Sequence, residues 1–258
     1  MKKIKFFAVA AFLAVATSAS AQFSNSGTKS SSTSGISTDG WSSVWVEWNP
    51  STMKIDRDNV DHESFTGFSL GYSQAFGITA GTPLFLEVGL GIQYSFKTRD
   101  MTEELDLDDD DLEFVDPKAK FNLLSAKIPV NLIYAFQIPN SSVTLMPFAG
   151  VNLRYNISGK QKMEWNFSDE IIDYMEDEYG RDWQEELGFE EEDINLFDKK
   201  DMGGEKNTWK RFQLGWHIGA KARISDKYLI GLSYGTDFSE LFKKTKIATT
   251  SITLGYIF

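Results

Sequence analysis

Apolar and other residues alternate with a period of two along most of the chain after Trp41, and residues 84–96 show this most clearly. One face of this segment carries seven apolar residues, Leu84, Leu86, Val88, Leu90, Ile92, Tyr94 and Phe96. The other face carries Phe85, Glu87, Gly89, Gly91, Gln93 and Ser95. Because successive side chains of a strand point to opposite faces, this pattern predicts a β-strand with one apolar face. At about 3.3 Å per residue and a tilt near 40°, such a strand rises about 30 Å, the thickness of a bilayer's hydrocarbon core.

The same alternation marks seven further segments: residues 41–49, 65–76, 122–136, 143–157, 209–224, 228–238 and 246–258. The connections at 77–82, 139–142 and 225–227 are short, whereas the others are longer. Outer-membrane barrels have short periplasmic turns, long outer loops and both termini in the periplasm. The pattern therefore predicts an all-β fold for residues 41–258, an eight-stranded antiparallel transmembrane β-barrel with short periplasmic turns and long acidic outer loops.

A soluble exported barrel of the lipocalin kind is the alternative, and it would turn the apolar face inward. Such a barrel needs a well-charged outer face, but the second face here is rich in Gly and Ser with scattered charges. Aromatic residues also gather near the strand ends, where the interfacial girdles of membrane proteins lie. They are Trp48, Tyr94, Phe96, Tyr134, Phe136, Tyr155, Tyr228, Phe238 and Tyr256. The membrane barrel is therefore the prediction.

The first 21 residues have the organisation of a signal peptide. Three lysines among the first five residues precede an apolar run at 6–15, which is too short to cross a bilayer as a helix. Ala21 and Gln22 flank the expected cleavage site, which has the small-x-small pattern. Residues 22–40 are rich in Ser, Thr and Gly, and we expect a flexible periplasmic lead-in. The expected location is the bacterial outer membrane, as an integral protein.

Composition narrows the class further. The chain has no cysteine, which excludes disulfides and a lipid-modified N-terminal cysteine. Its formal net charge of −11 becomes −14 once the three signal lysines are removed, and so acidic a chain is a poor ligand for nucleic acid. The mean hydropathy is −0.29, and the sequence has no second long apolar stretch. It therefore does not predict a helical membrane protein. The mature length of 237 residues fits one domain.

At these segments the sequence resembles the PorT-type outer-membrane β-barrel domain family. The matching stretches are SAKIPVNLIYAF (125–136), MPFAGVNLRYNISG (146–159), FQLGWHIGAKARI (212–224), YLIGLSYGTDFSEL (228–241) and the C-terminal TLGYIF. The resemblance covers most of the barrel, and each motif is loose. It implies an eight-stranded outer-membrane barrel, and it supplies no catalytic residues. One branch of the family serves a secretion machinery, and most members have no assigned role.

Nine ionisable residues fall on the inward face and form the candidate site. They are Glu47, Glu87, Lys127, Arg154, Arg211, His217, Lys221, Arg223 and Asp237. Isolated charges in a narrow, low-dielectric lumen are costly unless they are paired. We therefore expect a structural ion network that plugs the barrel, in which Arg211 pairs with Asp237 near the outer rim and Arg154 shares that carboxylate. The alternative is a narrow, weakly anion-preferring pore, or a gate that opens when these pairs rearrange.

A lipid-modifying enzyme is a further hypothesis, because some small outer-membrane barrels use Ser and His to hydrolyse lipids. The chain has two histidines, His62 in the first long loop and His217 in a strand. A histidine that acts on lipid should face the bilayer near the outer rim, and the alternation places His217 inward. We therefore predict no catalytic residue, no cofactor and no metal site.

The long loops are strongly acidic. Residues 100–116 hold ten carboxylates and residues 160–205 hold seventeen. An EF-hand loop that began at Asp106 would need Gly and Glu where Asp111 and Pro117 stand, so that motif fails. A solvated acidic rim with weak, nonspecific Ca²⁺ or Mg²⁺ association is the expectation, with residues 106–111 disordered unless divalent cations are present. Loops that bind a partner or cations specifically should be ordered against one another.

Within the second acidic loop, local signals predict a helix over residues 169–179. Ser168 can cap its N-terminus, Gly180 ends it, and Ile171, Ile172, Met175 and Tyr179 share one face. Asp182 can cap a second short helix that ends at Gly188. The apolar stripe could dock a partner or fold over the barrel mouth.

The leading functional hypothesis is a non-enzymatic surface barrel that displays acidic loops for interaction or envelope integrity. The expected contacts are outer-membrane lipid and a protein partner at these loops. The second hypothesis is a component of a secretion or transport assembly.

Overall fold

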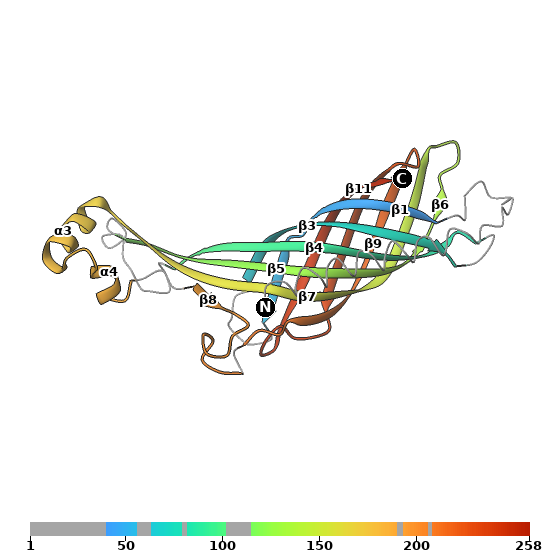
Figure 1. The fold of residues 1–258 in the computed structure, drawn as a ribbon. Coiled ribbons are helices and arrows are strands. Elements are labelled where there is room, and N and C mark those ends of the chain that lie inside the picture. Colours follow the sequence, from blue (N-terminus) through green and yellow to red (C-terminus); the bar gives the residue numbers. More distant parts are fainter. Residues whose placement is uncertain (1–39, 56–62, 79–81, 102–114, 190–192, 206–207) are drawn as a thin grey trace.

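The computed structural model describes residues 40–55, 63–78, 82–101, 115–189, 193–205 and 208–258 (Figure 1). The predicted signal peptide at 1–21 and all of the predicted lead-in except Gly40 lie outside the described residues. In the ranges described, no helix is long and apolar enough to cross a membrane.

Eleven strands and two helices make up the described chain. In order they are β1 (Trp41–Trp48), β2 (Ser51–Ile55), β3 (Glu63–Gly77), β4 (Leu84–Asp100), β5 (Val115–Tyr134), β6 (Phe136–Gln137), β7 (Val143–Phe167), α3 (Asp169–Tyr179), α4 (Trp183–Glu186), β8 (Asp193–Asn195), β9 (Phe212–Ile224), β10 (Tyr228–Asp237) and β11 (Thr245–Ile257).

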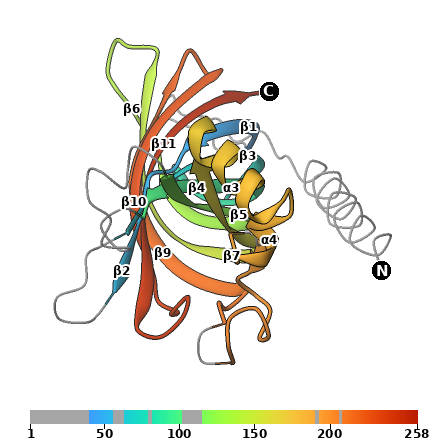
Figure 2. The same cartoon turned by 90° about the vertical axis from the view of Figure 1, so that its left-hand side faces the viewer.

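Antiparallel pairing closes the sheet into a barrel. The order runs β11-β10-β9-β7-β5-β4-β3, and β1 and β2 each pair with both β3 and β11. Because β1 and β2 share one position and β6 continues β5 along β7, the ring has eight positions. Figure 2, seen from the end that carries α3 and α4, shows the strands curving round into this ring. All eight predicted strands are therefore confirmed.

The apolar face of the strands points out of the barrel. Leu70 is 64% exposed and Ile92 is 49% exposed, whereas their neighbours Ser69 and Gln93 are each 5% exposed. All nine aromatic residues expected in the interfacial girdles are exposed as well. A soluble barrel would show the opposite arrangement, because its apolar side chains would fill the interior. The lipocalin alternative is therefore wrong, and the outward face suits lipid.

Two apolar clusters occupy the two ends of the barrel interior. At the short-turn end, Phe85, Ile133 and Met146 are fully buried and pack with Trp41 and Ile257 among others. At the long-loop end, the cluster consists of Met53, Leu123, Leu196, Trp209, Leu241 and Ile247. Polar and charged residues fill the space between the clusters, so the interior has a polar middle and apolar ends.

Trp45 adds a large ring to the polar middle, and glycines on two neighbouring strands make room for it. A Cβ atom on Gly91 would lie 2.5 Å from the Trp45 ring, and one on Gly71 would overlap it. Both glycines lie on the inward face, on β4 and β3. The Gly-rich inward face predicted from the sequence therefore has a packing reason.

The short turns and the barrel's two chain ends lie at one end. Ser225 and Asp226 both have positive φ, 51° and 57°, as a tight two-residue hairpin turn requires. The first strand pairs there with the end of β3, Trp41 opposite Ala75, and the amide of Phe258 donates to the carbonyl of Ser42 at 3.1 Å. The short predicted connections are confirmed at this end.

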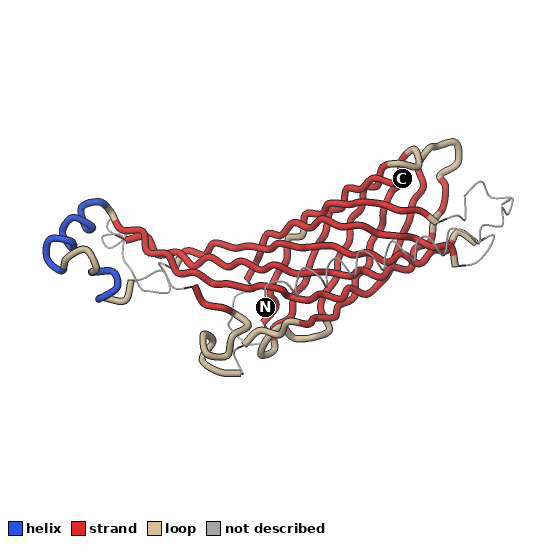
Figure 3. The backbone as a smooth tube through the Cα atoms, in the orientation of Figure 1, coloured by secondary structure: helices blue, strands red, loops and turns tan. Residues whose placement is uncertain are grey.

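Two features of the fold differ from the prediction. The first strand is interrupted at Asn49 and Pro50 and continues as β2. Pro50 has no backbone N–H to donate to a neighbouring strand. The amide of Thr250 still donates to the Pro50 carbonyl at 3.0 Å, so pairing resumes at once. Strands β5 and β7 also run well beyond the expected bounds, so parts of both predicted acidic loops are strand. Figure 3 shows these strands continuing past the barrel towards the helices.

Candidate functional site

Three ion pairs span the polar middle of the barrel interior. Glu87 of β4 meets Lys221 of β9 at 2.6 Å, and Asp237 of β10 meets Arg154 of β7 at 2.5 Å. The third pair joins Glu47 of β1 to Lys127 of β5. The six side chains are between 2% and 15% exposed. Each lumen carboxylate of the predicted set therefore faces a cation from another strand.

Neutral groups extend these pairs into a network. The amide of Asn131 donates to the Glu87 carboxylate at 2.9 Å, and the ring of His217 bonds to the Asn131 side-chain oxygen. The guanidinium of Arg154 also donates twice to the Gln213 side-chain oxygen, at 2.9 and 2.6 Å. Buried charges are tolerable only when their remaining donors and acceptors are satisfied, and these amides supply part of the partners that are needed.

Arg211 does not pair with Asp237, so this prediction is wrong. The guanidinium of Arg211 donates to the backbone carbonyls of Asn156 and Ile157 at 3.0 and 2.8 Å, and it lies 4.4 Å from the centre of the Phe197 ring. Strand β9 begins at Phe212 rather than Trp209, because the backbone amides of Trp209 and Lys210 donate to the carbonyls of Leu196 and Leu241 instead. Arg211 therefore lies just before strand β9, and the alternation of the strand does not determine which way its side chain points.

Arg223 lies towards the opposite end of the interior, close to the short turns. It pairs with Asp226 at 3.2 Å and lies 5.5 Å from the centre of the Trp41 ring. The predicted site has two more lysines and arginines than carboxylates. The two cations in excess, Arg211 and Arg223, therefore find their partners near the ends of the barrel interior. The middle of the lumen has as many cations as carboxylates. The alternative of a weakly anion-preferring pore rested on an excess of positive charge, and the middle of the lumen does not have it.

A cavity of about 70 Å³ lies among the side chains of the polar middle. Its lining includes Trp45, Asn49, Lys127, Asn152 and His217. Glu87 Oε2, Asn152 Oδ1 and Gln213 Nε2 are buried without a protein partner. Such atoms are usually satisfied by ordered water, and the cavity is large enough for a few water molecules. The cavity can hold ordered water among these polar groups, and an apolar cluster lies on either side of it along the barrel interior.

His217 lies inside the barrel, where its ring packs edge-on against Phe148 with the ring centres 5.7 Å apart. The other histidine, His62, lies outside the described residues. Over the described part of the chain, His, Asp and Glu side chains do not gather in threes in a way that could hold a metal ion. The carboxylates of residues 106–111, on which the divalent-cation prediction rests, also lie outside the described residues.

A second candidate site is the arm, which comprises residues 115–120 of β5, residues 160–167 of β7, and α3 and α4. Its two strands pair from Lys120 opposite Lys162 to Val115 opposite Phe167, beyond the last β3–β4 partners at Thr66 and Phe96. Figure 1 shows the arm projecting from the long-loop end, with α3 and α4 at its tip. The apolar stripe of α3 therefore does not cover the barrel mouth.

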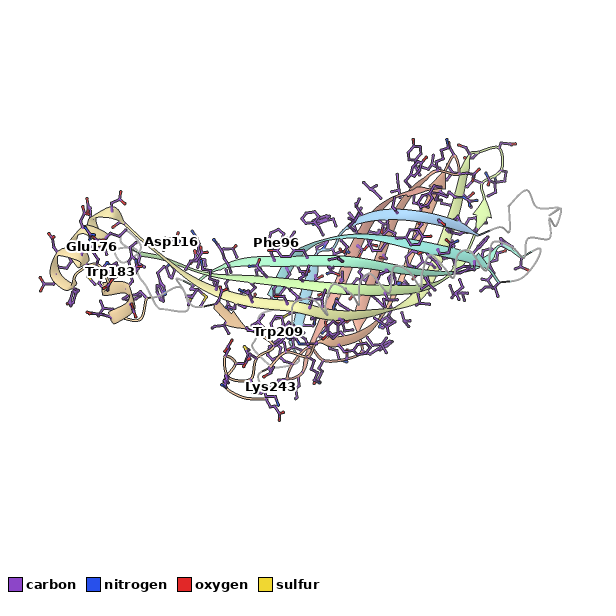
Figure 4. All side chains as sticks on the ribbon, viewed as in Figure 1. Phe96, Asp116, Glu176, Trp183, Trp209 and Lys243 are labelled. Atoms are coloured by element: carbon purple, nitrogen blue, oxygen red, sulfur yellow. The ribbon has the colours of Figure 1, made fainter. Side chains whose placement is uncertain are left out.

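We call the tip of the arm, residues 168–189, the head. Aromatic rings pack within it and against the end of β7. Trp183 of α4 is 2% exposed and lies edge-on to Phe167 at a ring-centre distance of 4.9 Å. Phe189 packs against Phe167 and Trp165 at 5.3 and 5.1 Å. Figure 4 shows Trp183 near the tip, with Glu176 on the neighbouring helix. The head is thus a folded unit rather than a plain connector.

Helix α3 begins and ends where the sequence predicts. The Ser168 side chain accepts a hydrogen bond from the amide of Ile171, and Gly180 follows the last turn. Asp182 is the N-cap residue of α4, as predicted, but its side chain makes no capping hydrogen bond. Tyr174 and Tyr179 are 61% and 52% exposed. The surface of the head combines exposed aromatic rings with nine carboxylates and one arginine.

Ion pairs run along the arm and its base. Lys120 meets Glu164 at 2.5 Å, and Lys160 meets Asp193 of β8. The hydrogen bond from Lys120 lowers the pKa of Glu164, and the hydrogen bond from Lys160 lowers the pKa of Asp193. Both side chains of the Lys160–Asp193 pair are about half exposed, so this pair contributes little to stability.

Comparison with known proteins identifies the barrel. Residues 7–258 match the family described as "Outer membrane protein beta-barrel domain". The sequence matches no curated protein with which it was compared.

Several solved structures resemble the fold, all at low identity. Ail of Yersinia pestis, crystallised with the heparin analogue sucrose octasulfate, is 19% identical, with 85% of this chain and 99% of Ail covered and a TM-score of 0.42. Neisserial surface protein A is 13% identical, with 84% and 97% covered and a TM-score of 0.38. The outer membrane enzyme PagL is 10% identical, with 81% and 97% covered and a TM-score of 0.39. Likenesses at this level carry no information about the activity of this chain.

Proposed function

Because the chain belongs to the outer membrane protein β-barrel domain family, we propose that it is a non-enzymatic surface barrel whose arm presents an acidic, aromatic head to a basic protein partner. The barrel anchors the arm in the bacterial outer membrane. In this arrangement the long-loop end faces the outside of the cell, and the short turns and both termini face the periplasm.

The observation that carries the proposal is the construction of the head. A connector that only hydrates the surface needs no core, whereas this one buries Trp183 against the rings of Phe167 and Phe189. The fold holds Tyr174 and Tyr179 exposed beside the carboxylates of α3. Aromatic residues are enriched in protein interfaces, and a net negative surface attracts a positively charged partner.

The interior contacts support a structural rather than a conducting role for the lumen charges. Each of Glu47, Glu87 and Asp237 has a cationic partner within the network. An ion path would have to pass the apolar cluster at either end. His217, inside the barrel, faces this network and not the bilayer, which supports a non-enzymatic role.

The resemblance to the PorT-type branch keeps a component of a secretion or transport assembly as the second candidate. In such an assembly, the arm would be the part that reaches a neighbouring subunit. A stable assembly would co-purify with the barrel in fixed stoichiometry, whereas a transient partner would be seen only after crosslinking. A role in envelope integrity predicts instead that cells with the arm removed become sensitive to detergent.

The proposal is tested by placing a photo-crosslinking amino acid at Tyr174 and, separately, at Tyr179 in the full chain in intact cells. We expect one discrete protein adduct at both positions, which weakens at high salt because the attraction is screened. Tyr228, 56% exposed at the short-turn end, is the matched control position. Absence of an adduct at the head, or the same adduct at Tyr228, would contradict the proposal.

A further inference from the structure

Two lysines of the barrel wall, Lys54 and Lys246, stand directly opposite each other on β2 and β11. They are partners in the antiparallel register, and both are exposed. Opposed residues of an antiparallel pair project from the same face with their Cβ atoms about 5 Å apart, and like charges there are destabilising. The outward face of the barrel therefore carries two adjacent positive charges that the sheet by itself disfavours.

The carboxylates of the described residues form no ion pair with either lysine. Lysines elsewhere near the long-loop end do have such partners, in the pairs Lys97–Glu63, Lys120–Glu164 and Lys160–Asp193. The ammonium of Lys54 instead donates to the Tyr234 hydroxyl at 3.2 Å, reaching across β11 to β10. The Tyr234 oxygen accepts this bond, so its own O–H is left to donate. Two ammonium groups and one hydroxyl thus offer donors on one patch of wall.

The height of this patch on the barrel follows from β11. Lys246 and Tyr256 share the outward face of the strand and are ten residues apart. At about 3.3 Å per residue and a tilt of about 40°, that separation is a rise of about 25 Å, the height of the apolar band of outer-membrane barrels. Tyr256 pairs with Tyr228 near the short turns, and Ile252 and Leu254 lie outward in between. Lys246 and Lys54 therefore stand at the far edge of the band, where lipid headgroups lie.

We propose that Lys54, Lys246 and Tyr234 form a binding site on the barrel wall for the phosphate group of a membrane lipid headgroup. A phosphate supplies the negative charge that relieves the repulsion between the two ammonium groups. Its several oxygens can accept from both lysines and from the hydroxyl together, and hydrogen bonds between charged partners are the stronger ones. Ala248, the next outward residue of β11 after Lys246, is only 5% exposed and lies beneath the neighbouring side chains of the patch.

The site is tested with the full chain in detergent, by native mass spectrometry against phosphatidic acid and against diacylglycerol with the same acyl chains. We expect the wild type to retain phosphatidic acid and not diacylglycerol. The double variant Lys54→Gln/Lys246→Gln should bind phosphatidic acid about thirtyfold more weakly, since each lysine near an anionic surface contributes roughly a fivefold gain. Tyr234→Phe should weaken binding severalfold.

The matched control is Lys160→Gln/Lys199→Gln, which removes the same charge from lysines that already have carboxylate partners. Phosphatidic acid binding by this control should equal that of the wild type. Equal binding by the Lys54→Gln/Lys246→Gln variant, with its folded gel mobility retained, would overturn the site. Inorganic phosphate that binds as tightly as phosphatidic acid would overturn the assignment to a lipid headgroup.

Discussion

Inside the barrel, single residues are held by charges that meet across the lumen. The Asp237–Arg154 pair is the clearest case, because both side chains are less than 10% exposed and Gln213 satisfies further donors of the arginine. Taking two charges out of water is costly, and the pair repays this only while both partners are present. The loss of one partner therefore matters far more than the net worth of the pair.

We predict that Asp237→Ala lowers the free energy of unfolding by about 3–5 kcal/mol, because Arg154 is left buried without a counter-charge. The measurement is urea unfolding and refolding in lipid vesicles. Asp226→Asn is the control, since Asp226 is 83% exposed in its pair with Arg223, and its effect should be below about 1 kcal/mol. Equal losses in the two variants would show that the lumen pair is not a special determinant of stability.

The sequence places Asp237 on the inward face but cannot choose its partner. Alternation assigns a direction to each residue within a strand, and it does so for Arg154, Gln213 and Asp237. It fails for Arg211, because the strand starts one residue later, at Phe212. The neutral partners Asn131 and Gln213 were missed as members of the network, although both occupy inward positions next to predicted charges.

At the scale of elements, the barrel strands were predictable because lipid on one side and a narrow lumen on the other impose a strict alternation. In the outer parts of β5 and β7, lysines such as Lys118, Lys120 and Lys162 stand where the barrel strands have apolar residues, so the alternation stops there, although Ala119 is only 1% exposed. Helix α3 was predictable for a different reason, since Ser168 and Gly180 mark its ends locally. The aromatic core of the head depends on contacts between Trp165 and Phe189, far apart in sequence, and was missed.

The pairing of β8 with β7 at the base of the arm should depend on pH. The pKa of Asp193 is lowered by its hydrogen bond from Lys160, so the folded arm holds the ionised form. This stabilisation is present above the carboxyl group's ordinary pKa and is lost as the pH falls through the lowered value. Because the pair is exposed, the expected effect is small: spin labels at the paired positions 161 and 194 should show a modest increase in mean distance between pH 7 and pH 3.

Lys160→Gln is the control for this effect, because it removes the partner that lowers the pKa of Asp193. The two labels should then show a smaller change over the same pH range. High salt should also reduce the change, since the pair is exposed. A separation that is the same at both pH values would refute the dependence.

At the scale of the whole molecule, the structure combines a closed ring, a filled interior and one long projection. The ring satisfies the backbone hydrogen bonds of every strand, as a spanning structure in lipid requires. The polar middle lies between two apolar clusters, and the arm carries the head away from the barrel (Figure 1). The orientation of the strand faces is the claim on which the rest depends, because it separates a membrane barrel from a soluble one.

That orientation can be measured residue by residue, because the chain has no cysteine and single cysteines can be introduced along β4. A fluorophore attached at Ile92 or Tyr94, which are 49% and 46% exposed, should be quenched by brominated lipid in vesicles. The same fluorophore at Gln93 or Ser95, each 5% exposed, should not be quenched. Heat-modifiable gel mobility of each variant is the control for insertion. Quenching at Gln93 and Ser95 but not at Ile92 and Tyr94, or no alternation at all, would contradict the barrel described.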